Sequence, residues 1–143
     1  MQLPLAGGCT LPVVDAECAR EWMGVVHRVA RDAGWRVSGT ALPPTVGQNY
    51  YAVDCEGLLQ LRLNVPLRLV GAVYDADSRL NAEFRDVPGP DAFGEAGFAV
   101  ASVTQLEGGF TDSDLAQLTE PERKDIAHHR VWRLGDVVFN WFD

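Results

Sequence analysis

Residues 50–65, YYAVDCEGLLQLRLNV, contain two β-rich runs on either side of the turn pair Glu56-Gly57. In the second run, leucines alternate with the polar residues Gln60, Arg62 and Asn64. An alternation with a period of two residues is typical of an antiparallel strand that is buried on one face. This stretch therefore predicts a β-hairpin with strands at residues 50–55 and 58–65.

Further strands are predicted on both sides of this hairpin. Alternating or continuous apolar runs lie at residues 35–41, 67–74, 79–87 and 98–106, whereas residues 88–97 are rich in Gly and Pro and predict a loop. Because most of these runs follow one another through short turns, we expect a sheet of about six mainly antiparallel strands.

Helices are predicted before and after the sheet. Apolar residues recur at helical spacing in residues 15–33, with Asp15 as N-cap and Gly34 as the end signal. Three shorter helices are predicted near the C-terminus, at residues 112–118, 119–128 and 134–142. Since helices and strands are segregated along the chain, we expect a single α+β domain over residues 1–143.

The composition limits the classes of partner. The chain has 143 residues, with 12 Lys plus Arg against 20 Asp plus Glu, and a net charge of -8. Negative charge repels nucleic acids and anionic membrane surfaces, so neither is expected as a partner, and it favours a basic protein. The sequence contains no apolar run of membrane-spanning length and no signal-peptide pattern, which predicts a cytoplasmic protein.

The sequence gives no support for a metal or another cofactor. The D-x-D pairs that begin at Asp75 and Asp112 lack the remaining ligands of a calcium loop. Neighbouring helical residues such as His128 and His129 point about 100° apart, so they are poorly placed to share one metal. The three cysteines form no CxxC motif, and their odd number predicts reduced, buried thiols.

The C-terminus is unusually aromatic. Trp132, Phe139, Trp141 and Phe142 fall between residues 132 and 142. Chain ends fray unless they are docked, so these side chains predict either packing into the core or a homodimer contact. The sequence alone leaves a monomer and a homodimer open.

No catalytic residues are predicted, because the chain has no nucleophile elbow, no P-loop and no zinc-protease motif. We therefore expect a protein-binding domain whose acidic surface contacts a basic partner. The candidate contacts are carboxylates predicted in turns and at helix starts, namely Asp75, Asp77, Asp112, Asp114, Glu120 and Glu122. In its overall format the chain is similar to bacterial immunity proteins and secretion chaperones, and the first resemblance implies neutralisation of a basic toxin.

An alternative hypothesis is a small-ligand-binding protein or an enzyme with its pocket between the sheet and the helices. The residues considered for that pocket are Tyr50, Tyr51, His128 and His129. Because neighbouring strand residues face opposite ways, one tyrosine is expected in the core and the other on an exposed face of the sheet.

Overall fold

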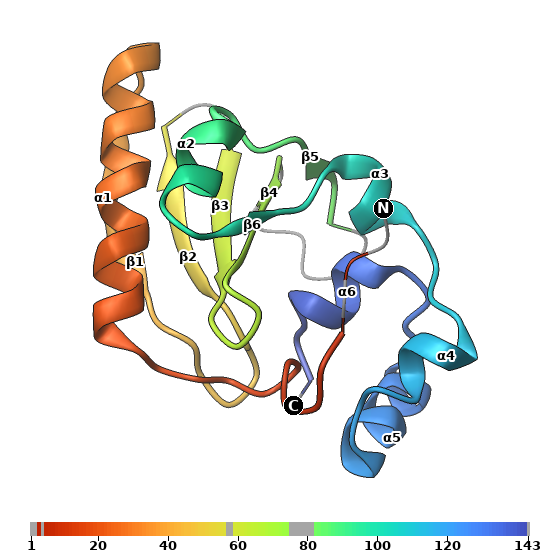
Figure 1. Ribbon diagram of the computed structural model, residues 1–143. Helices are drawn as coiled ribbons and strands as arrows, with labels where there is room; N and C mark the ends of the chain where they lie inside the picture. The colour runs from red at the N-terminus through yellow and green to blue at the C-terminus, as the bar shows by residue number, and fades with distance from the viewer. Residues whose placement is uncertain (1–2, 4, 57–58, 75–81, 143) are drawn as a thin grey trace.

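The computed structural model describes residues 3, 5–56, 59–74 and 82–142. In this part of the chain an N-terminal helix is followed by a six-stranded, mostly antiparallel sheet and by short C-terminal helices, which confirms the α+β fold (Figure 1). Helix α1 (Ala16–Ala33) begins where the Asp15 carboxylate accepts a hydrogen bond from the Cys18 amide, and it ends at Gly34.

Five strands form the sheet in sequence order, and β2 and β3 pair as the predicted hairpin, with Tyr51 opposite Leu63 and Cys55 opposite Leu59. The sixth strand, β6, pairs with β4 in the parallel orientation, whereas β5 pairs with β4 in the antiparallel orientation. The strands are β1 (Val37–Leu42), β2 (Tyr51–Cys55), β3 (Leu59–Asn64), β4 (Leu69–Val73), β5 (Phe84–Arg85) and β6 (Ala99–Val100).

The predicted elements between residues 88 and 106 are wrong. Residues 88–97 include helix α2 (Pro90–Glu95), because Pro90 occupies the first helical turn, where its missing N–H costs nothing. The run at 98–106 contains only the two residues of β6, and Ser102 then caps helix α3 (Val103–Glu107) through a reciprocal capping box with Gln105.

The three C-terminal helices form as predicted, but the first and the last of them are shorter than the sequence patterns indicate. They are α4 (Asp112–Leu115), α5 (Glu120–His129) and α6 (Leu134–Val138). After α6 the described chain forms no further helix or strand, and Phe139 packs so closely against β4 that a Cβ at Gly71 would lie 2.5 Å from its ring atom Cε2. Phe139 is buried, and Trp141 and Phe142 are partly buried against the same core, so the segment is docked within the chain.

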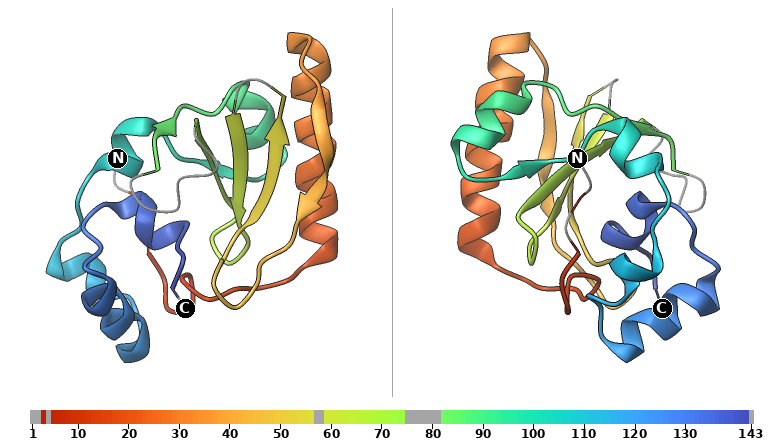
Figure 2. Two further views of the ribbon diagram at one scale, coloured as in Figure 1. Left: turned by 180° about the vertical axis from the view of Figure 1, so that it is seen from behind. Right: turned by 45° about the vertical axis from the view of Figure 1, so that its right-hand side comes forward.

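The sheet separates two hydrophobic cores. On one side, α1 and α2 pack over residues such as Tyr51, Val53 and Leu61. On the other side, α3, α6 and the C-terminal segment pack over residues such as Ala52 and Leu69. In the view from behind, β1 lies in front of α1 and β2 and β3 lie beside it, and none of the described helices crosses over these three strands (Figure 2, left). These helices therefore leave one part of this second face open.

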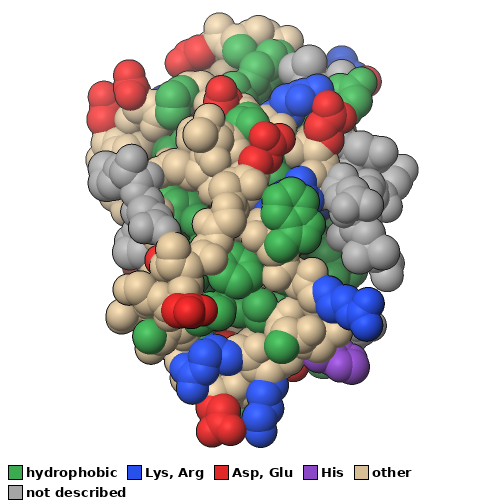
Figure 3. All heavy atoms as spheres, turned by 90° about the vertical axis from the view of Figure 1, so that its right-hand side faces the viewer, with side chains coloured by type: hydrophobic (Ala, Val, Ile, Leu, Met, Phe, Trp, Pro, Cys, Tyr) green, Lys and Arg blue, Asp and Glu red, His purple; other side chains and the backbone are tan. Residues whose placement is uncertain are grey.

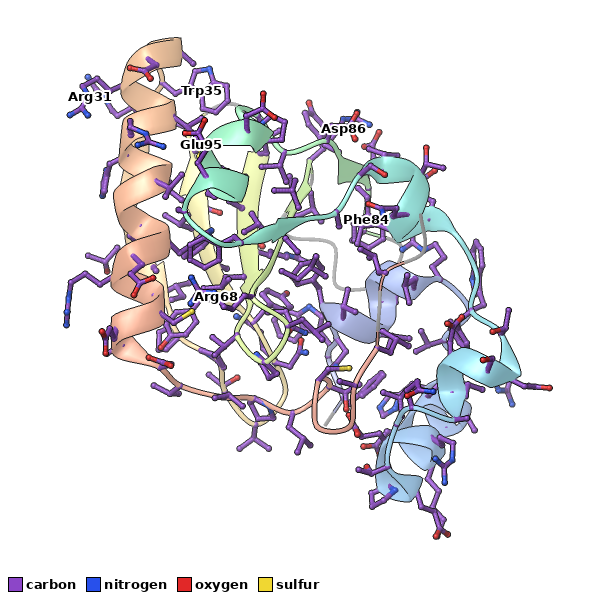
Figure 4. All side chains as sticks on the ribbon, in the orientation of Figure 1. Arg31, Trp35, Arg68, Phe84, Asp86 and Glu95 are labelled. Atoms are coloured by element: carbon purple, nitrogen blue, oxygen red, sulfur yellow. The ribbon has the colours of Figure 1, made fainter. Side chains whose placement is uncertain are left out.

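Arg68, in the turn between β3 and β4, connects the elements of the first core. Its guanidinium points toward α1 (Figure 4), where Nη2 lies 3.2 Å from Glu21 Oε2. The same group lies over the Phe98 ring, 4.2 Å from its centroid, and Nε donates a hydrogen bond to the Gly97 carbonyl. These contacts fasten α1 to the segment that joins α2 and β6.

All three cysteines are unpaired and buried, and burial raises the pKa of each thiol. We therefore expect native Cys9, Cys18 and Cys55 to react slowly with a maleimide at pH 7, because the reactive species is the thiolate. Thiol counting with and without urea measures this. Three rapid equivalents in urea and fewer in the native protein are expected, whereas three rapid equivalents without urea would contradict the buried placement.

Candidate binding surface

The carboxylates predicted as partner contacts occupy different environments. Asp75 and Asp77 lie outside the described residues. Asp112 and Glu120 are exposed, and Glu120 Oε1 lies 3.3 Å from Lys124 Nζ. Asp114 belongs to the capping box of α4, where its carboxylate accepts from the Thr111 amide at 2.8 Å. Among the members of this set that the structure describes, Asp112 is therefore the exposed one whose carboxylate takes part in no capping box and in no ion pair with another described residue.

Glu122 is not part of an exposed acidic surface, which corrects the expectation from the sequence. It is 1% exposed, and its carboxylate accepts hydrogen bonds from the Gly8 amide at 2.7 Å and the Thr10 amide at 3.0 Å. The Thr10 and Thr119 hydroxyls also donate to it. These donors overcome desolvation and lower the pKa of Glu122 from 4.5 to about 2. Its function is to hold the N-terminal segment against α5.

Buried asparagines fix the other side of this N-terminal segment. Asn64 Nδ2 donates to the carbonyls of Cys9 and Val138, at 2.9 and 2.8 Å. Asn140 Nδ2 donates to the Thr10 carbonyl at 3.0 Å, and the Asn140 amide donates to Asn49 Oδ1. Residues 8–10 and 137–140 are thereby clamped together on the sheet. This hydrogen-bond network holds the fold together. Its members lie far apart in the chain, so their spacing in the sequence could not predict that they are bonded to one another.

The four residues considered for a pocket between sheet and helices do not line one cavity. Tyr50 and Tyr51 are 1% and 5% exposed and lie in the two cores on opposite faces of the sheet, so the expectation of one exposed tyrosine is wrong. His128 is exposed at the end of α5. His129 stacks on Phe142, with ring centroids 4.8 Å apart.

Among the four aromatic residues that the sequence places near the C-terminus, Trp132 is the one whose side chain remains exposed, at 66%. Its indole lies beside Arg133, the next residue in the chain. The guanidinium carbon of Arg133 is 5.7 Å from the centroid of the Trp132 ring and 4.6 Å from that of the Phe84 ring. Arg133 is itself held by Asp136, with Nε 2.9 Å from Oδ2. The neighbouring cation is therefore fixed against the core, while the indole faces solvent.

An open pocket adjoins this segment, since a Cβ at Gly109 would lie 3.7 Å from the Trp132 carbonyl oxygen. The Leu134 amide also donates to the Gly108 carbonyl at 2.7 Å. The pocket has a volume of about 470 Å³, and its lining includes Leu3, Ser102, Gln105, Gly108, Gly109 and Leu134. Because the two glycines have no side chains, backbone and apolar groups are accessible there. We call Trp132, Gly108, Gly109 and the exposed carboxylates that precede and follow this glycine pair in the sequence, Glu107 and Asp112, the Trp132 surface.

The charge on this side of the molecule is unevenly distributed. Asp and Glu side chains gather in the upper half of the view, near α3, whereas Lys and Arg predominate at the lower end, near α5 (Figure 3). Hydrophobic side chains lie between them (Figure 3). Glu107, Asp112 and Asp86 are exposed, and Asp86 accepts a hydrogen bond from the Val103 amide at the start of α3. On this side of the molecule an acidic region thus adjoins hydrophobic side chains (Figure 3).

The residues that the structure describes contain no group of three or more His, Cys, Asp or Glu side chains placed to hold a metal ion. None of the described helices is long and apolar enough to cross a membrane.

Comparisons with protein-family models, curated proteins and solved structures give no match to this chain.

Proposed function

We propose that the protein is a binding module that docks a basic protein partner on the Trp132 surface. The observation that carries the proposal is the 66% exposure of Trp132, whose carbonyl oxygen lies close to Gly109 in the lining of a pocket of about 470 Å³. Tryptophan is enriched among the residues that dominate binding energy, because its large ring loses much hydration on contact.

The net charge of -8 supports a basic partner, because complementary charge accelerates association and excludes acidic competitors. In its most specific form, the proposal is that of an immunity-type protein that covers a basic toxin. A cytoplasmic location forms part of the proposal and is supported by the three unpaired cysteines.

The test begins with capture of a partner from a lysate of the source organism at low salt, followed by binding kinetics on the captured protein. Trp132→Ala is expected to weaken the affinity by about thirtyfold, which corresponds to about 2 kcal/mol for a central interface residue. Val46→Ala is the matched control, because Val46 is 87% exposed and belongs neither to the pocket lining nor to the Trp132 surface.

The electrostatic part of the proposal is tested with charge reversal. Glu107→Lys with Asp112→Lys should slow association, whereas Glu17→Lys with Asp32→Lys, on the exposed side of α1, changes the net charge equally and should slow it much less. Raising the salt from 0.1 to 1 M shortens the screening length from about 10 to about 3 Å and should reduce this difference. Equal slowing by both pairs, or normal affinity of Trp132→Ala, would refute docking at the Trp132 surface.

A further inference from the structure

The open part of the sheet carries an irregularity in its edge strand. Ser38, Asp54 and Gln60 lie opposite one another across β1, β2 and β3, and the next row consists of Leu42, Ala52 and Arg62. Between these rows β1 contains three residues where β2 and β3 each contain one, so its register with β2 shifts. Gly39 has a φ of 73°, a backbone conformation that residues with side chains rarely adopt. The bulge is therefore encoded by the sequence, and bulges commonly adjoin functional sites.

A pocket of about 260 Å³ lies at this bulge. Its lining includes Ser38, Thr40, Leu42, Asp54 and Gln60. The Leu42 side chain is 62% exposed at the end of β1. The pocket thus combines one carboxylate and two hydroxyl residues with an apolar residue.

The carboxylate in the pocket is held by a relay of side chains. Gln60 Nε2 donates to Asp54 Oδ1 at 3.1 Å, and Arg62 Nε donates to Gln60 Oε1 at 2.7 Å. Because an ionised carboxylate only accepts and a guanidinium only donates, these two bonds fix the orientation of the Gln60 amide. Arg62 is 2% exposed, and its guanidinium carbon lies 4.4 Å from the centroid of the Tyr50 ring. The relay therefore anchors the exposed Asp54 side chain to the core.

Asp54 forms no ion pair with a Lys, Arg or His of the described residues. Its closest cationic neighbour along the relay, Arg62, is separated from it by the Gln60 amide and stacks on Tyr50. The Asp54 carboxylate is therefore available to a cation that enters the pocket from solvent.

We propose that this pocket receives a lysine side chain of the basic partner. A lysine ammonium has three N–H donors, which match the Asp54 carboxylate and the hydroxyls of Ser38 and Thr40. The methylene stem of a lysine can lie on Leu42 while the charged end enters the pocket. The assignment of a protein as the source of the lysine rests on the proposed function, but the pocket is separate from the Trp132 surface.

The test is an NMR titration of the full chain with Nα-acetyl-lysine methylamide, and with Nα-acetyl-norleucine methylamide as the uncharged probe. The lysine probe should bind in the millimolar range and shift the amide signals of Ser38, Thr40 and Asp54, whereas the norleucine probe should not. Asp54→Asn should weaken binding about tenfold, because a charge-assisted hydrogen bond is lost. Glu56→Gln, which removes an exposed carboxylate nearby, is the control and should leave binding unchanged.

Equal binding of the two probes, or unchanged lysine affinity in Asp54→Asn, would overturn the assignment. Trp132→Ala should bind the lysine probe as the parent protein does, which keeps this test independent of the proposed function. If the probe fails to bind while a partner still depends on Trp132, the lysine pocket is refuted and the Trp132 surface is retained.

Discussion

A chain that ends at Val138 is expected to be unfolded or insoluble. Truncation removes Phe139, which is 2% exposed, and Asn140, which is 3% exposed and joins residues 8–10 to the sheet. Loss of a buried Phe typically costs about 3–5 kcal/mol, and the total stability of a domain is about 5–15 kcal/mol. Circular dichroism during heating measures the result.

Point variants keep this prediction testable if the truncated chain cannot be purified. Asn140→Ala should lower the free energy of unfolding by about 2 kcal/mol or more, because it leaves the buried Thr10 carbonyl without its donor. Trp132→Ala, at an exposed aromatic side chain, should change it by less than about 0.5 kcal/mol. A truncated chain that melts cooperatively at the parent temperature would contradict the core placement of this segment.

Glu122→Gln is expected to destabilise the protein at pH 7 by about 1–3 kcal/mol, because buried N–H groups lose their charged acceptor, the carboxylate whose pKa these donors lower from 4.5 to about 2. An amide has one acceptor oxygen in place of two, so it cannot satisfy the amides of Gly8, Thr10 and Thr119. Urea denaturation measures the loss. Glu120→Gln, at an exposed carboxylate in the same helix, is the control and should have little effect.

The pH dependence of this difference identifies its cause. Because the pKa is lower in the folded protein, the contribution of Glu122 is complete above the unfolded pKa and is lost as the pH falls from about 4.5 toward 2. The difference in unfolding free energy between the parent protein and Glu122→Gln should therefore shrink over this range. A difference that is constant from about pH 7 to about pH 2.5 would show that the carboxylate charge is not responsible.

The sequence predicted those elements whose signals are local. The hairpin of β2 and β3 follows from the alternation of leucines, and α1 follows from its apolar face between Asp15 and Gly34. Each pattern is contained in one element and agrees with the tertiary packing, so local and global preferences coincide. Thr119 and Glu122 likewise form a capping box at the start of α5, a signal that lies within one helical turn.

The errors arose where one local signal competed with another. Residues 98–106 are apolar enough for a strand, but Ser102 and Gln105 have the spacing of a capping box and start α3 instead. The Gly and Pro content of residues 88–97 favours a loop, although Pro90 followed by Asp91 is equally typical of a first helical turn. The spacing of Ser102 and Gln105 is thus the sequence signal for α3, whereas the signal for α2, which has no side-chain cap, is Pro90 in its first turn.

The candidate surface was less accessible to sequence reasoning, because exposure is a tertiary property. Trp132 and Phe139 belong to one aromatic cluster in the sequence, yet Phe139 packs on Gly71 while Trp132 remains exposed. Glu122 resembles an exposed helix residue, and its burial depends on Thr10, which lies far away in the chain. The Gly108-Gly109 pair, whose backbone lies close to that of Trp132, is the local sequence signal for an open surface in this region.

Hydrogen–deuterium exchange on the complex with the captured partner tests the central claim most directly. We expect partner binding to slow exchange at residues 104–112 and 131–133, which include the Trp132 surface, and to leave the exposed side of α1 unchanged. Slower exchange confined to α1, with residues 104–112 and 131–133 unaffected, would contradict docking at the Trp132 surface.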